Sequence, residues 1–315
     1  MKFSVGLNFE NDAFVDAVIK YKNEISEVYF SWGAFPNGRS DQLRSENLPP
    51  WQMQSKQIEA LEKMHNEGIS FNLLFNANCY GVESQSWSLF NRIGEVVDYV
   101  LNEYSLSCVT TTSPLIAKFI KANFENVEVR ASVNMEIGTV EGMEYLSDYF
   151  DSFYIKRECN HDFAHIEKLY NYAQEEGKKL CVLANSGCLN NCSAHVFHDN
   201  LVAHESEISK MNNAYNFTGI CKEFLSNEQN YPSLISRLNF IRPEDIDKYE
   251  AYFVSAKLAT RIHPTPVQVL ESYVKRKYSG DVLRLLEPTH SIYPYVIENG
   301  EPLALKKIHT DVGML

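Results

Sequence analysis

The chain has 315 residues, of which 44% are hydrophobic and 22% are charged. That composition can form one large α/β domain or two ordinary ones, and it excludes an intrinsically disordered protein. A formal net charge of -12 argues against non-specific nucleic-acid binding, which needs clustered lysines and arginines. The first residues lack a signal-peptide pattern, and no apolar run approaches about 18 residues. We therefore expect a cytoplasmic protein without a membrane-spanning segment.

An apolar strand, a polar turn and an amphipathic helix follow one another eight times along the chain. The strands are predicted at residues 3–8, 27–31, 70–75, 108–112, 128–133, 152–156, 181–184 and 253–258. The helices are predicted at residues 11–24, 58–68, 93–104, 114–124, 139–149, 162–176, 243–249 and 266–278. Residues 32–53, rich in Gly, Pro, Asn and Ser, are expected to form an ordered loop.

Eight such units predict an α/β protein of the (β/α)8 TIM-barrel type over residues 1–280. An insertion of about residues 198–236 follows strand seven. Residues 281–315 include Pro288, Pro294, Gly300 and Pro302, and we expect them to form an irregular C-terminal tail packed on the barrel.

The seven cysteines separate into two groups on this barrel. An odd count in a chain without an export signal argues against a disulfide framework. Cys108 and Cys181 lie at strand starts, where we expect small buried hydrophobic residues. The other five follow strand ends or lie in the insertion, on the face where barrel enzymes place their active sites: Cys79, Cys159, Cys188, Cys192 and Cys221.

Cys188-x3-Cys192 is the strongest local motif, because two thiols in one loop can turn towards one metal. Thiolates bind soft metals, so an iron–sulfur cluster and zinc are both possible. For zinc, the pair would be completed by Cys221 and one of three nearby histidines: His195, His198 and His204. The alternatives are unliganded loop thiols and histidines that only form hydrogen bonds.

Basic residues near strand eight predict an anion-binding site. Lys257 and Arg261 lie where this strand ends, so their charges should point into the barrel mouth, and Arg242 is a further candidate. Weaker mouth candidates follow strands one to three: Asn8, Tyr29 and Asn76. A local groove for RNA would need several cations on one surface: Arg130, Lys156, Arg157, Arg242 and Lys257.

Two segments resemble the collagenase-like peptidase family U32. They are Ile241-Arg242-Pro243-Glu244-Asp245-Ile246 with Tyr249, and Ala256-Lys257-Leu258-Ala259-Thr260-Arg261. The loop Ala184-Asn185-Ser186-Gly187-Cys188-Leu189-Asn190-Asn191-Cys192 looks like that family's loop after strand seven.

The resemblance agrees with a barrel and implies a 4Fe-4S cluster held by four cysteines, as in family members that act in oxygen-independent hydroxylation. Cys188 and Cys192 match the family's loop, and Cys221 matches as a downstream ligand. Cys79 is the fourth choice, with Cys159 or a histidine as alternatives. The gap between the loop cysteines is shorter here than in better-known members.

Three functions follow from these observations. The first is an iron–sulfur enzyme, or its subunit, that takes part in hydroxylation of a small molecule, RNA or peptide. The second is a zinc-dependent hydrolase or peptidase, although no HExxH helix and no GxSxG elbow is present. The third is a non-catalytic sensor or scaffold that binds the cluster and needs a partner subunit.

Overall fold

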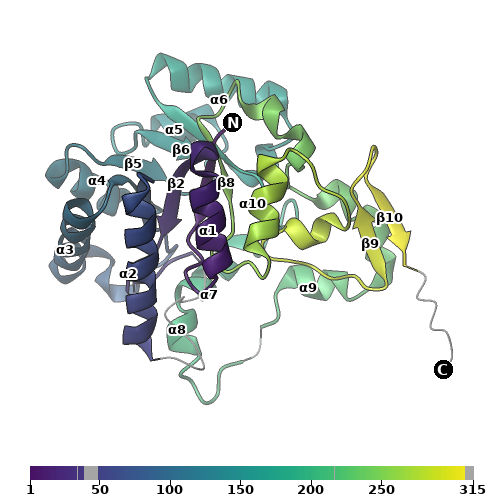
Figure 1. The fold of residues 1–315 in the computed structure, drawn as a ribbon, viewed down its shortest axis with the longest axis horizontal. Helices are drawn as coiled ribbons and strands as arrows, with labels where there is room; N and C mark the ends of the chain where they lie inside the picture. The colour runs from purple at the N-terminus through teal and green to yellow at the C-terminus, as the bar shows by residue number, and fades with distance from the viewer. Residues whose placement is uncertain (34, 39–48, 216, 309–315) are drawn as a thin grey trace.

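The computed structural model describes residues 1–315 except 34, 39–48, 216 and 309–315, and its core is a closed parallel barrel (Figure 1). Each strand of the described chain pairs with its sequence neighbour, and β1 also pairs with β8, so the predicted (β/α)8 barrel is confirmed. The strands are β1 Phe3–Gly6, β2 Ile25–Phe30, β3 Phe71–Phe75, β4 Leu106–Thr111, β5 Glu128–Ala131, β6 Ser152–Tyr154, β7 Lys179–Leu183 and β8 Ser255–Leu258.

Helices surround the barrel and bury one apolar face each against it (Figure 1). In the first of them the Asn11 side chain accepts the backbone N–H of Phe14, which caps an orphan donor at the helix start. Ser86 and Ser113 cap two later helices in the same way. The outer helices are α1 Asp12–Lys20, α2 Pro50–Asn66, α3 Trp87–Glu103, α4 Pro114–Asn123, α5 Val140–Glu144, α6 Phe163–Glu175 and α10 Pro266–Val274.

Some element boundaries differ from the sequence prediction. Residues 34 and 39–48 of the loop predicted over 32–53 lie outside the described residues. Its predicted end differs from the structure, because α2 begins at Pro50, whose missing N–H has no cost in the first turn of a helix. Helix α3 begins at Trp87 and not at residue 93. The predicted helix at 243–249 is a 3-10 helix, η7 Pro243–Tyr249.

The amino-terminal half of the barrel interior holds a paired network of charged and polar side chains. Arg130 of β5 donates to Glu27 of β2 at 2.5 Å and to Glu128 at 2.7 Å, and it is 5% exposed. Ser4 Oγ and Asn72 Nδ2 each donate to Glu27 Oε1 at 2.7 Å. This network is called the barrel base below. Cys108 and Cys181 are both buried, as predicted.

The insertion after β7 and the C-terminal segment share a second apolar core. The insertion contains α7 His195–Ala203, α8 Glu205–Ile208 and α9 Ile220–Leu225. The segment expected to be an irregular tail also contains a two-stranded antiparallel sheet, β9 Tyr295–Glu298 with β10 Ala304–Lys307 (Figure 1). Ile297 of this sheet packs into the second core. The other buried residues of that core are Leu189, Leu225, Tyr231, Leu234, Leu238, Phe240, Val282, Leu283, Leu286 and Ile292.

None of the helices in the described residues combines the length and the apolar character needed to cross a lipid bilayer.

Candidate active site

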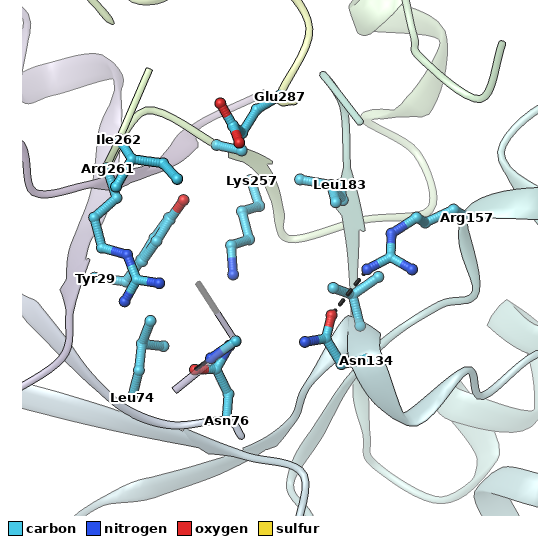
Figure 2. Close-up of a pocket in the computed structure, with 13 residues that line it drawn as sticks. Tyr29, Leu74, Asn76, Asn134, Arg157, Leu183, Lys257, Arg261, Ile262 and Glu287 are labelled. Carbon is cyan, nitrogen blue, oxygen red and sulfur yellow. Dashed lines mark hydrogen bonds between the residues drawn. The ribbon is translucent and has the colours of Figure 1, made fainter. Parts of the chain in front are cut away.

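A small polar cavity of about 40 Å³ lies at the carboxyl ends of the barrel strands (Figure 2). We call it the mouth pocket. Its polar lining comes from strands and loops on several sides of the barrel: Tyr29, Asn76, Asn134, Arg157, Lys257, Arg261 and Glu287. This is the face on which barrel enzymes carry their active sites.

The Lys257 side chain, from β8, lines the mouth pocket (Figure 2). It is 7% exposed, and its Nζ lies 4.2 Å from the ring centroid of Tyr29 and 5.3 Å from that of Tyr154. The Tyr29 hydroxyl donates to the Leu258 carbonyl at 3.0 Å, which holds the ring in place. The two aromatic faces stabilise the buried ammonium by cation–π attraction.

Arg261 stands beside Lys257, as predicted from the end of strand eight (Figure 2). Its guanidinium is buried and donates to Ser31 Oγ at 3.2 Å and to Asn37 Oδ1 at 2.8 Å. The backbone here approaches β1 so closely that a Cβ on Gly6 would lie 2.8 Å from the Arg261 nitrogen. Only glycine fits at position 6 without a shift of β1 or β8.

Arg157 and Glu287 complete the charges of the mouth pocket, and neither was predicted as a mouth residue. Arg157, 2% exposed, follows β6 and donates to Asn134 Oδ1 and to Glu136 Oε1, each at 2.8 Å. Its place after a strand end was a signal in the sequence, whereas nothing in the sequence pointed to Glu287. Among the described lining residues, three side chains are cationic and one is anionic, so the lining carries a net positive charge.

Arg242 lies elsewhere, although it was predicted with the other two cations. It pairs with Asp245 at 2.7 Å and with Glu301, and it donates to the Gly300 carbonyl at 2.7 Å. It precedes η7 and so faces the C-terminal segment, which it ties to the barrel. The hypothesis of one RNA-binding groove is also wrong for Arg130, because that side chain is inside the barrel base.

The loop after β7 carries Cys188 and Cys192, and the insertion brings Cys221 close to them. Burial raises the pKa of Cys221, and the neighbouring thiols of Cys188 and Cys192 raise it further. Asn239 Nδ2 donates to the Cys188 carbonyl at 3.0 Å, which holds the loop against the chain leading to β8. These three predicted metal ligands therefore lie near enough for their charges to interact.

Gly187 fixes this cysteine loop to the C-terminal segment. Its N–H donates to the Glu287 carbonyl at 2.8 Å, and its own carbonyl is 2.7 Å from His290 Nε2. A Cβ at this position would lie 2.0 Å from the Pro288 carbonyl oxygen, so any other residue would displace one of the two segments.

His195 links the cysteine loop to the mouth pocket. Burial alone would lower its pKa, but hydrogen bonds to Cys188 and Glu136 raise the pKa to about 10. Its Nε2 is 2.6 Å from Arg157 Nη1 and 3.4 Å from Asp199 Oδ2. The Arg157 guanidinium opposes protonation of His195, but Cys188, Glu136 and Asp199 together favour it more strongly. The loop and the pocket are thus joined through a single chain of polar contacts.

The cysteine loop fits a soft metal in the chemistry of its donors. Cys188, Cys192 and Cys221 supply three thiols, the ligand type that iron–sulfur clusters and zinc prefer. Within the described ranges, however, no three His, Cys, Asp or Glu side chains stand together as a ready-made metal site. Cys79 lies close enough to His204 for the imidazole to lower its pKa, and Cys159 packs beside Gly138, so the identity of a fourth ligand stays a prediction.

Known proteins resemble this chain in sequence and in fold. No protein-family model matches. The chain is 23% identical over 288 residues to the uncharacterized protease MJ1657 of Methanocaldococcus jannaschii, which covers 89% of this chain and 81% of that protein. The solved structure of the U32 peptidase Mk0906 has the same fold, with a TM-score of 0.56 and 13% identity, and covers 82% of this chain and 91% of that one. The chain thus shares its fold with a U32 peptidase and is similar in sequence to a protein named a protease, which agrees with the resemblance that the sequence motifs indicated.

Proposed function

We propose that this relative of the U32 peptidases is an enzyme that binds an anionic group of its substrate in the mouth pocket. We further propose that the adjoining cysteine loop carries a metal centre, for which a 4Fe-4S cluster is the first candidate. Its reaction would be an oxygen-independent redox modification, such as hydroxylation, of a small molecule, an RNA base or a peptide.

The buried cationic pocket is the observation that carries this proposal. Arg157, Lys257 and Arg261 are buried and line one small cavity whose described lining holds a single carboxylate, so its net positive charge favours a bound anion. A cavity of about 40 Å³ admits a carboxylate or a similarly small group, so the rest of a larger substrate would stay outside.

Cys188, Cys192 and Cys221 would hold the metal centre. A 4Fe-4S cluster bound there would supply electron transfer, or a Lewis-acid iron if its fourth position is not taken by the protein. Lys257 and Arg261 would orient the anionic group of the substrate. Arg157, in contact with both Asn134 of the pocket and His195 of the loop, would keep the two parts in register.

Anion binding can be tested by thermal unfolding of the full chain in acetate, succinate, sulfate and phosphate at constant ionic strength. We expect at least one of these anions to raise Tm in a saturable way. Lys257→Met should weaken that affinity by roughly ten- to one-hundred-fold, because it removes a charge-assisted hydrogen bond of about 1.5–3 kcal/mol. Lys248→Met, a change of the same kind at an exposed lysine, is the matched control. Equal anion responses in all three proteins would refute the binding proposal.

The metal centre can be tested by anaerobic purification with iron, sulfide and zinc analysis of the intact chain, Cys192→Ala and Cys108→Ala. About four iron and four sulfide per chain, lost in Cys192→Ala and kept in the buried-thiol control Cys108→Ala, is the expected result. A chain with no metal would overturn this part of the proposal.

A zinc-dependent hydrolase is the second candidate, and the contact between Cys188 and His195 favours it. Cys188, Cys192 and His195 are a ligand set that zinc accepts, with water in the open position. One zinc per chain without sulfide would replace the cluster proposal by this one.

A further inference from the structure

Lys257 presents a primary amine inside the mouth pocket from a fixed position on the barrel. It lies on β8, where it is paired with Leu183 of β7 on one side and with Ser4 of β1 on the other. The Ala184 N–H also donates to the Lys257 carbonyl at 2.9 Å. A side chain on a barrel strand is held more precisely than one on a loop, and the catalytic groups of such barrels come from strand ends.

Aromatic and aliphatic groups lie around this amine. Its Nζ is 4.2 Å from the Tyr29 ring centroid and 5.3 Å from that of Tyr154, and the side chain is buried. Aliphatic residues complete the apolar part of the lining: Leu74, Val133, Leu183 and Ala259. A desolvated lysine beside other cations is the type that enzymes use to form imines with carbonyl compounds, and an enclosed site protects an imine from hydrolysis.

Two guanidinium groups line the same cavity as the amine. Figure 2 shows the Lys257 Nζ pointing into the space between Arg261 on one side and Arg157 on the other. Neighbouring side chains accept hydrogen bonds from both arginines at 2.8–3.2 Å, so each guanidinium is held in one plane, as binding of a carboxylate requires. A cavity of about 40 Å³ leaves little room beyond that carboxylate, so a carbonyl that reaches Lys257 must adjoin it.

We propose that Lys257 forms an imine with a 2-oxo acid, whose carboxylate is bound by Arg157 and Arg261 while its carbonyl carbon lies against Lys257 Nζ. This inference rests on the anion-binding part of the proposed function and names the substrate class of that pocket. It adds a covalent role for Lys257 and does not involve the metal centre.

The reaction forms one carbon–nitrogen double bond and releases one water molecule. The Nζ lone pair of the neutral amine attacks the carbonyl carbon, and the carbonyl oxygen becomes the hydroxyl of a carbinolamine. The Glu287 carboxylate, which lines the same cavity, carries the two amine protons to that oxygen one after the other, and the oxygen leaves as water. No oxidant or reductant is consumed, and hydrolysis of the imine restores the free amine and the 2-oxo acid.

The test uses the full chain with pyruvate and sodium cyanoborohydride, which reduces an imine to a stable secondary amine. We expect about one reduced pyruvyl group per chain by intact-mass analysis, and peptide mapping should place it on Lys257. Lys257→Met should lose the adduct, whereas Lys248→Met, at an exposed lysine, should keep the wild-type yield. Acetone has the carbonyl but no carboxylate, so it should label Lys257 roughly ten-fold more slowly or less.

A variant that keeps the charge separates this inference from anion binding. Lys257→Arg retains a cation but forms no imine, so its Tm should still rise with the anion that stabilises the intact chain, while pyruvate gives no adduct. An intact chain that is stabilised by an anion but gives no adduct on Lys257 would overturn the imine and leave the anion site standing. Adducts spread over exposed lysines, or equal labelling of Lys257 by acetone, would also overturn the proposal.

Discussion

The two ends of the barrel interior use charged residues in opposite ways. At the barrel base, Arg130 contacts two carboxylates, and Glu128 also pairs with Lys179 at 2.7 Å. At the mouth pocket, cations outnumber carboxylates among the described lining residues, and the Tyr29 ring contacts Lys257. Both groups are buried, so burial does not distinguish them.

The difference lies in the balance of positive and negative side chains within each group. A paired network holds strands together but cannot attract a further ion, because its potential is already neutralised. An excess of one sign raises the local concentration of the opposite ion. The barrel base therefore serves folding, whereas binding is the role that we propose for the mouth pocket, in keeping with the two faces of such barrels.

Arg130→Met should break the barrel base and give the largest effect. It leaves Glu27 in the interior without its cation and Glu128 with Lys179 alone, a loss that costs about 3–5 kcal/mol of unfolding free energy. Urea denaturation would measure the change. Arg92→Met, which breaks an exposed pair with Glu83, should cost at most about 1 kcal/mol. Similar losses in the two variants would contradict the assignment of the base to stability.

Acid should weaken the barrel base through Glu128. Burial opposes ionisation of this carboxyl, but Arg130, Lys179 and Ser152 lower its pKa to about 2. A carboxyl with a depressed folded-state pKa stabilises the protein above its unfolded pKa, and this contribution is lost as pH falls through the folded value. Between pH 5 and 2 we expect the wild type to lose about 2–3 kcal/mol more than Glu128→Gln. Parallel stability curves for the two proteins would exclude this role.

Gly187→Ala tests the contact that holds the cysteine loop against the C-terminal segment. The added Cβ collides with the Pro288 carbonyl, so the cysteine loop or the C-terminal segment must move, at a cost of about 1–3 kcal/mol. We expect a lower Tm and a lower metal content after anaerobic purification. Gly177→Ala is a useful comparison, because space is open there and only its positive φ of 63° opposes a side chain.

Lys257→Met should change the unfolding free energy only slightly, in contrast to Arg130→Met. Removing one of several neighbouring cations relieves repulsion while it loses the contact with the Tyr29 ring, so we expect a change within about 1 kcal/mol. Urea denaturation of this variant beside Arg130→Met gives the answer. A loss as large as that of Arg130→Met would mean that Lys257 is a structural residue.

The sequence predicted those features that depend on strand order and strand ends. Periodicity placed Lys257 and Arg261 at the end of β8, and barrel geometry then brought them together in the mouth pocket. It also predicted that Cys108 and Cys181 are buried near strand starts. These are local properties that closure of the barrel preserves.

The remaining contacts depend on how distant segments pack, which no local pattern records. Arg130 was a candidate for RNA binding, because an arginine in a strand gives no sign of whether it faces the interior. Glu287 reaches the mouth pocket from beyond the barrel, and His204 reaches Cys79 from the insertion. Both required the folded arrangement of segments outside the repeating βα units.

The position of Glu287 also bears on the order of events during synthesis. The barrel strands end at Leu258, but the carbonyl of Glu287 holds Gly187 and its side chain lines the mouth pocket. A chain still attached to the ribosome can close its barrel well before this residue has left the exit tunnel. The mouth pocket is therefore completed only once residue 287 has emerged, later than the last strand of the barrel.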